Sequence, residues 1–205
     1  MNAVVRALTD SDPVLRMQTH LLGAAADLPN ADVLARIIAA QRVGNSCLPL
    51  HLGLDLNTFS ALMQRYFPGT LFWLALHSGH EEAFRRGVLR QQLLEMRSDE
   101  WRDVRELLLS GRRGEDESEI WLAAIVAAAC LGGEHLWRDL GLASRMELGQ
   151  LLRHNFPGVA LLNDRDMKWK KFFYRQLCET QGHFVCRSPS CEQCAAFSDC
   201  FGAEE

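Results

Sequence analysis

The chain has 205 residues, of which 48% are hydrophobic and 23% are charged, so it can form one globular domain or two small ones and is neither fibrous nor disordered. Its formal net charge of −4 argues against a protein that holds a phosphate backbone, because such proteins usually carry a basic excess. We therefore expect no nucleic-acid partner.

The start of the chain, Met1 to Asp10, lacks the basic residues and long apolar run of a secretory signal, so we expect a cytoplasmic protein. The most apolar stretch, Ile120 to Gly133, is shorter than the roughly 20 residues that a helix needs to cross a bilayer. It is predicted to be a buried core helix, and no membrane association is expected. In a reducing compartment, the seven cysteines are more typical of metal ligands or core residues than of disulfides.

Most of the chain has the apolar spacing of helices. Residues Phe59, Leu62, Met63 and Tyr66, for example, fall at i, i+3, i+4 and i+7. The segments Asp99 to Leu109 and Arg165 to Leu177 also have the pattern of helices. Because strand patterns are few and short, we predict an all-α fold, a compact helical domain that ends in a cysteine-rich metal-binding loop. The body would cover residues 1–182 and the loop residues 183–205.

An internal duplication is predicted within the body, covering about 31–109 and 119–178. Matched positions are Leu34 and Leu122, Ile37 and Ile125, Gly44 and Gly132, and Gly53 and Gly141, and the Phe-Pro-Gly of 67–69 recurs at 156–158. Shared turn residues after matched helices indicate a repeated unit. Chance remains the alternative, because alanine and leucine are common residues.

Four cysteines near the C-terminus have the spacing C-x4-C-x2-C-x5-C: Cys186, Cys191, Cys194 and Cys200. Four thiolates within fifteen residues can converge on one metal centre, and soft thiolate ligands favour zinc or an iron–sulfur cluster. Spacing alone leaves these two metals open. Two other cysteines, Cys47 and Cys130, lie in apolar segments and are predicted to be core residues, while Cys178 could serve as a fifth thiol or as a small buried hydrophobe.

Other side chains near this loop could take part in its chemistry. His183 could complete the ligand sphere of a metal or donate a hydrogen bond to a thiolate or sulfide. His135 is the other candidate histidine, and it is also typical of a surface residue at a helix end. The pair His77 and His80 has the spacing of a metal clip, but its setting favours an exposed turn.

A basic run precedes the cysteines: Arg165, Lys168, Lys170, Lys171 and Arg175. It could attract an oxyanion or an acidic partner, but an ordinary solvated helix face is the favoured interpretation. The apolar residues of the same segment, Trp169, Phe172, Phe173 and Leu177, are predicted to pack beneath the loop, and core packing is sufficient to explain them.

Three stretches together resemble the NifQ family: His135-Leu-Trp-Arg-Asp-Leu-Gly-Leu142, Met167-Lys-Trp-Lys-Lys-Phe-Phe-Tyr-Arg-Gln-Leu-Cys178, and the four-cysteine loop closing on Phe201-Gly202. The resemblance implies a carrier of an iron–sulfur cluster, of 4Fe-4S or molybdenum–iron–sulfur type, held by Cys186, Cys191, Cys194 and Cys200. It further implies delivery of molybdenum, with molybdate as the metal source, for the nitrogenase iron–molybdenum cofactor. The implied partners are the nitrogenase reductase and the cofactor scaffold.

Two further classes of function stay open. The cysteine spacers also resemble the cluster loop of helix-hairpin-helix DNA glycosylases, although the second glycine of their hairpin is absent, since Ala160 and Leu161 follow Val159. A zinc-stabilised helical interaction module would need no chemistry at all. Because no catalytic triad, Walker-type loop or dinucleotide fingerprint is present, we predict a metal donor and not an enzyme.

Overall fold

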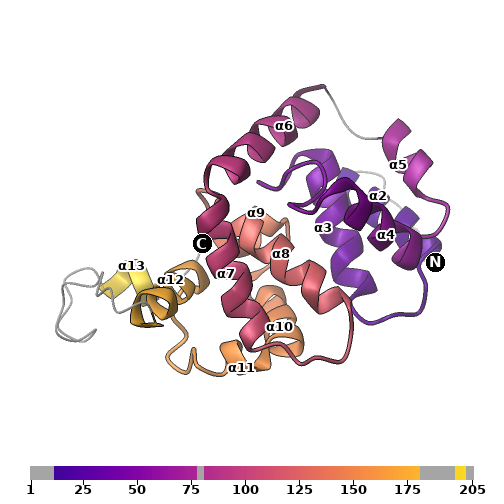
Figure 1. Cartoon of the computed structure of the whole chain (residues 1–205). Coiled ribbons are helices and arrows are strands. Elements are labelled where there is room, and N and C mark those ends of the chain that lie inside the picture. Colours follow the sequence, from indigo (N-terminus) through magenta and orange to yellow (C-terminus); the bar gives the residue numbers. More distant parts are fainter. Residues whose placement is uncertain (1–11, 78–80, 181–196, 202–205) are drawn as a thin grey trace.

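The computed structural model describes residues 12–77, 81–180 and 197–201. Every regular element in these ranges is a helix, so the all-α prediction is confirmed (Figure 1). The helices are α2 (Pro13–Gly23), α3 (Ala31–Val43), α4 (Leu56–Tyr66), α5 (Leu71–Leu76), α6 (Glu81–Met96), α7 (Ser98–Ser110), α8 (Ser118–Cys130), α9 (Leu136–Leu140), α10 (Arg145–Asn155), α11 (Pro157–Ala160), α12 (Trp169–Thr180) and α13 (Phe197–Phe201).

Helix α8 forms the centre of the body (Figure 1). All but one of its residues, from Ser118 to Cys130, are buried, which confirms the predicted core helix. A helix that is apolar on every side has to be surrounded, and α7 and α9 are among the helices that pack against it. The helix ends before Gly132, where the chain turns into α9. Among the described helices, none is long and apolar enough to cross a membrane.

Helices α4 and α10, which lie in the two predicted repeats, have matching ends. Asp55 caps α4 by accepting a hydrogen bond from the Thr58 N–H, and Ser144 caps α10 by accepting one from the Glu147 N–H. Both helices have 11 residues and stop at a phenylalanine with nearly the same backbone angles, φ −134° at Phe67 and φ −130° at Phe156. The duplication itself stays a prediction.

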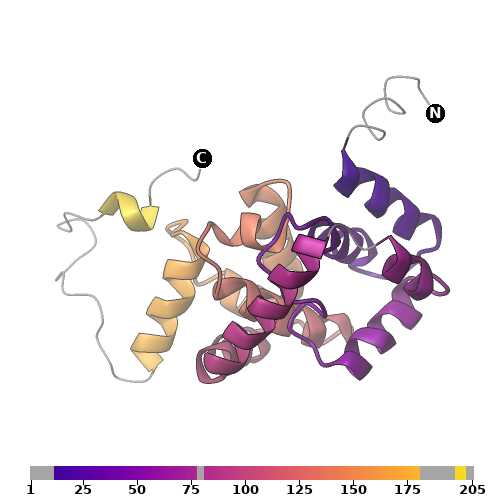
Figure 2. The same ribbon diagram turned by 90° about the horizontal axis from the view of Figure 1, so that it is seen from above.

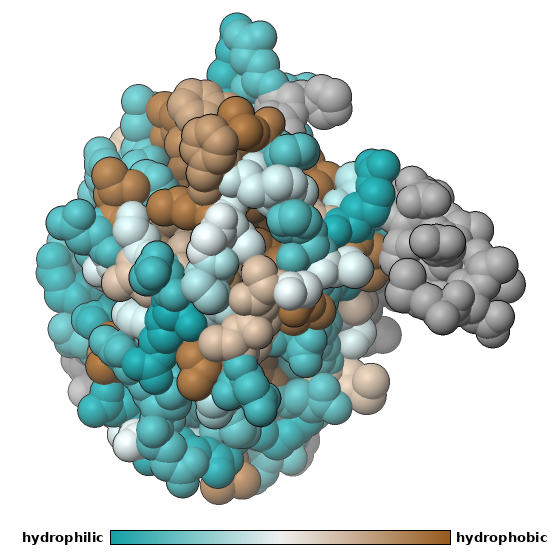
Figure 3. Space-filling model, turned by 90° about the vertical axis from the view of Figure 1, so that its right-hand side faces the viewer, coloured by the Kyte–Doolittle hydropathy of each residue, from teal (hydrophilic) through white to brown (hydrophobic). Residues whose placement is uncertain are grey.

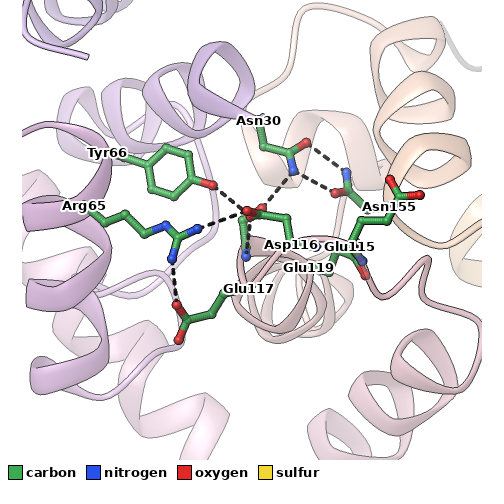
Figure 4. Close-up of polar contacts among 9 residues, drawn as sticks. Asn30, Arg65, Tyr66, Glu115, Asp116, Glu117, Glu119 and Asn155 are labelled. Atoms are coloured by element: carbon green, nitrogen blue, oxygen red, sulfur yellow. Dashed lines mark hydrogen bonds and ion pairs between the residues drawn. The ribbon is translucent and has the colours of Figure 1, made fainter. Parts of the chain in front are cut away.

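A polar network joins helices that are distant in sequence (Figure 4). The Asn30 Nδ2 donates to Ser118 Oγ at 2.9 Å and to Asn155 Oδ1 at 2.8 Å, and the Asn155 Nδ2 donates back to Asn30 Oδ1 at 3.0 Å. The buried Glu119 carboxylate accepts hydrogen bonds from the N–H groups of Gly114, Glu115 and Asp116. These bonds satisfy the polar groups where α3 and α8 begin and α10 ends.

The boundaries of the last long helix differ from the prediction. Helix α12 begins at Trp169 and not at Arg165, and it continues to Thr180. The reason is a turn in which the Asn163 side chain binds both the N–H and the carbonyl of Met167, and Asp166 has a φ of 52°. Such a left-handed residue interrupts a right-handed helix. The segment predicted over Asp99 to Leu109 does form a helix, α7.

Helices α5 and α6 expose several large apolar side chains, which include Phe72 at 75% and Met96 at 81% exposure. Apolar side chains gather over the upper part of the face drawn in Figure 3, where α5 lies. At the other side of the body, α12 packs on α7, and α13 lies beside the start of α12 (Figures 1 and 2). Residues 197–201, the described part of the cysteine segment, therefore lie on the opposite side of the molecule from the apolar face of α5.

Candidate metal centre

The four predicted metal ligands are divided by the limits of the described residues. Cys200 lies on α13 and is half-buried. The other three, Cys186, Cys191 and Cys194, lie outside the described residues, as does His183. Within the ranges that the structure describes, no three His, Cys, Asp or Glu side chains are grouped to hold a metal ion. The four-thiolate centre therefore stays a prediction, and the structure gives the surroundings of one of its ligands.

Three contacts attach the Cys200 segment to the body. The backbone N–H of Lys168 donates to the Cys200 carbonyl at 2.7 Å. The Lys168 ammonium donates to the Ser198 carbonyl at 3.1 Å. The Arg165 guanidinium lies 5.4 Å from the centre of the Phe201 ring, within the range of a cation–π contact. A helix of five residues is too short to be stable alone, so these contacts, together with the packing of Cys200 and Phe201 against the core, hold the segment in place.

A surface hollow of about 300 Å3 lies beside Cys200. It is lined by the turn from Gly132 to Leu136, by residues 168–171 and by Asp199. Glu134 and Asp199 bring negative charge to the same walls as Lys168 and Lys171, so the charges in the hollow are mixed. His135, which is half-buried, is also part of the wall. The predicted neighbours of the cysteine loop are thus brought together on one face.

One lysine of the basic run points into the body. The Lys170 ammonium forms an ion pair with Asp139 and donates to the Gly132 carbonyl at 2.9 Å. Asp139 is only 4% exposed, and its carboxylate also accepts the Glu134 N–H at 3.0 Å. A Cβ atom on Gly132 would lie 2.4 Å from the Asp139 carboxylate, so this turn requires a residue without a side chain. The solvated-face interpretation is therefore wrong for Lys170.

The other members of the basic run lie at the surface. Lys171 is exposed, and Arg175 forms an ion pair with Glu179 one helical turn away. Exposed pairs of this kind contribute little to stability, between about 0 and 1 kcal/mol. For these two residues the solvated-face interpretation fits the structure.

The aromatic residues of α12 are core residues, as predicted. Trp169 and Phe172 are each 4% exposed and Phe173 is fully buried, with ring centres 5.8 to 5.9 Å apart. The next residue, Tyr174, donates its hydroxyl hydrogen to Glu100 of α7. Burial, and secondarily this hydrogen bond, raises the pKa of Tyr174. Helix α12 therefore has one face fixed to the body.

The two buried cysteines of the body are not available as ligands. Cys47 and Cys130 are buried, which confirms their assignment to the core. Burial raises the pKa of the Cys130 thiol to about 12, and burial together with the nearby Asp139 charge raises the pKa of Cys47 further. Neutral thiols in an apolar setting are poor nucleophiles and poor metal ligands. Cys178 is half-buried on α12, and its role stays open.

The remaining predicted histidine site gives no metal clip among the described residues. His77 is exposed at the end of α5, and its ring stacks on Trp73 with a centre-to-centre distance of 4.4 Å. His80 lies outside the described ranges. His20 also stacks on Trp73, with ring centres 3.5 Å apart. The exposed position of His77 agrees with the favoured interpretation of this segment as a surface turn.

Comparison with known proteins decides the family. The family model described as NifQ matches residues 33–202, which is most of the chain. The chain belongs to the NifQ family. It is 57% identical to Protein NifQ of Azotobacter vinelandii over 171 residues, 83% of this chain and 87% of that protein. It is 37% identical to Protein NifQ of Klebsiella pneumoniae over 175 residues, 85% of this chain and 99% of that one. No solved structure matches the chain.

Family membership confirms the resemblance inferred from the sequence, and it identifies a nitrogen fixation protein with a role in biosynthesis of the nitrogenase cofactor. Membership of the NifQ family favours this role over the alternative of a DNA glycosylase. What the sequence did not reveal is the pair formed by Asp139 and Lys170. Both belong to the stretches that carry the family resemblance. The one sign of this pair in the sequence was a single aspartate within the largely apolar stretch from His135 to Leu142.

Proposed function

We propose that this protein carries an iron–molybdenum–sulfur cluster on Cys186, Cys191, Cys194 and Cys200 and supplies molybdenum for the nitrogenase iron–molybdenum cofactor. Molybdate is the proposed metal source, and the nitrogenase reductase and the cofactor scaffold are the proposed recipients. In this proposal the protein donates metal and does not catalyse turnover. The support comes from membership of the NifQ family and from the spacing of the four cysteines.

The observation that carries the proposal is the contrast between Cys200 and the thiols of the core. Cys200 is half-buried on α13, and its neighbour Asp199 lines an open surface hollow. Cys47 and Cys130 are enclosed, and their raised pKa values keep them protonated at neutral pH. A metal ligand must be a thiolate, so the accessible thiol is the better donor.

The chain's own residues suit a thiolate-ligated cluster at this place. Such clusters carry net negative charge, and their reduction potentials depend on nearby charge and hydrogen bonds. Lys168 supplies positive charge in the adjacent hollow, and the buried rings of Trp169 and Phe172 support the helix beneath it. We propose that three thiolates anchor iron and that a more labile corner exchanges molybdenum with the partners.

Metal analysis after anaerobic purification tests the proposal. Iron, molybdenum, zinc and acid-labile sulfide are measured in the native protein, in Cys191→Ala and in the matched control Cys47→Ala. We expect iron, sulfide and molybdenum in the native protein, their loss in Cys191→Ala, and their retention in Cys47→Ala. Stoichiometric zinc without iron or sulfide would contradict the proposal and favour a zinc-stabilised interaction module instead.

A further inference from the structure

We infer that Lys168 and Lys170 form a clamp that sets the position of Cys200, and that their role at the site is to orient this ligand. The basic run before the cysteines would then act through geometry, and not by attracting an oxyanion or an acidic protein. We call these two residues the lysine clamp. Its relevance to the cluster rests on the proposed function, but its geometry does not.

The inner side of the clamp is Lys170. Its ammonium reaches between two parts of the body, the Asp139 carboxylate of α9 and the Gly132 carbonyl of the turn that precedes α9. The side chain of Lys170 is 17% exposed and that of Asp139 is 4% exposed, so water competes weakly for this contact. Truncating one partner of such a pair leaves an uncompensated buried charge. The first turn of α12 is therefore fixed to the body at this residue.

The outer side of the clamp is Lys168, two residues earlier. Its backbone N–H and its ammonium bind the carbonyls of Cys200 and Ser198 in α13. Trp169 lies between the two lysines and is 4% exposed, so it adds an apolar anchor at the same point. Because Lys168 and Lys170 are joined by two backbone steps, fixing Lys170 also fixes the Lys168 N–H that holds Cys200. Asp139 thus holds Lys170 in place, and Lys170 in turn holds the Lys168 N–H that binds the Cys200 carbonyl.

The contacts of the two ammonium groups indicate that these lysines orient Cys200 and do not serve to attract an oxyanion or an acidic protein. Lys170 is paired with Asp139, and Lys168 donates to a backbone carbonyl. Glu134 and Asp199 offset positive charge in the hollow. Lys171, the adjacent residue, carries the same charge but is exposed. If charge alone mattered, Lys171 would contribute as much as its neighbours, and this makes Lys171→Met the matched control.

The first experiment needs no metal. Amide hydrogen exchange of the metal-free full chain is measured by NMR at the Lys168 N–H, in the native protein, Lys170→Met and Lys171→Met. Loss of the inner contact should make this amide exchange about tenfold faster in Lys170→Met, the effect of weakening one hydrogen bond. Lys171→Met should leave the rate unchanged. Equal rates in all three proteins would overturn the clamp.

The second experiment uses the cluster-loaded protein. Visible circular dichroism and electron paramagnetic resonance spectra report the geometry and the electronic surroundings of the cluster. Lys168→Met should change these spectra at unchanged iron content, Lys168→Arg should restore them because it keeps a donor for the Ser198 carbonyl, and Lys171→Met should match the native protein. Identical spectra in Lys168→Met and Lys171→Met would refute a positioning role. Absence of iron from the native protein would instead contradict the proposed function, and the exchange result would still stand.

Discussion

The Asp139 carboxylate is the contact on which the attachment of α12 depends. Replacing it with alanine removes the partner of the Lys170 ammonium and the acceptor of the Glu134 N–H together. Breaking a buried ion pair from one side costs about 3–5 kcal/mol. Lys170 keeps its bond to the Gly132 carbonyl and is 17% exposed, so we place Asp139→Ala near the lower limit, at about 3 kcal/mol. For a chain of this size, that lowers the melting temperature by about 6–12 °C.

Urea and thermal unfolding, followed by circular dichroism, measure this effect in the metal-free protein. The matched control is Asp99→Ala, which removes a carboxylate that is 90% exposed and paired with Arg102. It should cost less than about 1 kcal/mol. The double variant Asp139→Ala with Lys170→Met should be less destabilised than the sum of the single variants by about 1–3 kcal/mol. A cost for Asp139→Ala as small as that of Asp99→Ala would refute the description of this pair as buried and coupled.

Three further predictions concern the thiols and the glycines of the body. In the native state at neutral pH, Cys47 and Cys130 should resist a maleimide while Cys178 and Cys200 react, and all four should react after unfolding, which mass spectrometry of labelled peptides can show. Because burial raises the folded-state pKa of Cys47 and Cys130, only the unfolded chain loses these protons above about pH 8.5, so stability should fall as the pH rises beyond that value. A Cys47→Ala variant should show a weaker decline in urea unfolding between pH 8 and pH 10. Gly132→Ala should destabilise the protein by about 1–3 kcal/mol, because its Cβ would meet the Asp139 carboxylate. Gly133→Ala, which has nothing within 4 Å of its Cβ, should not destabilise it, and equal stability of the two glycine variants would contradict the packing of this turn.

Several helices could be predicted because the residues that determine them are close together in the sequence. The apolar period of Phe59 to Tyr66 gives α4, whose four predicted residues are all buried, and the all-apolar stretch after Ile120 gives α8. Helical period and capping residues are properties of a few consecutive side chains, so a single sequence contains them.

The ion pair of Lys170 could not be predicted in the same way. The residue stands in a run of lysines and aromatics, and a helical wheel places it on the side of Phe173, Tyr174 and Leu177, which does not identify the group that pairs with its ammonium. Its partner Asp139 is 31 positions away, and only the packing of α12 against α9 brings the two together. The same is true of the start of α12, which depends on the Asn163 side chain and on a left-handed residue at Asp166. Tertiary contacts of this kind leave no periodic signal.

The attachment of α13 to the start of α12 makes the cysteine segment a loop that is closed at both ends. The segment leaves the body at Thr180, the last residue of a 12-residue helix about 18 Å long, and the chain is held again at Cys200 by the residue that precedes the same helix. Its ends are thus tethered before any metal binds. Closing a ring costs entropy that rises only with the logarithm of its length, so most of this cost has already been met by folding. On the proposed function, a metal that binds Cys200 would therefore meet a ligand whose backbone the body already holds.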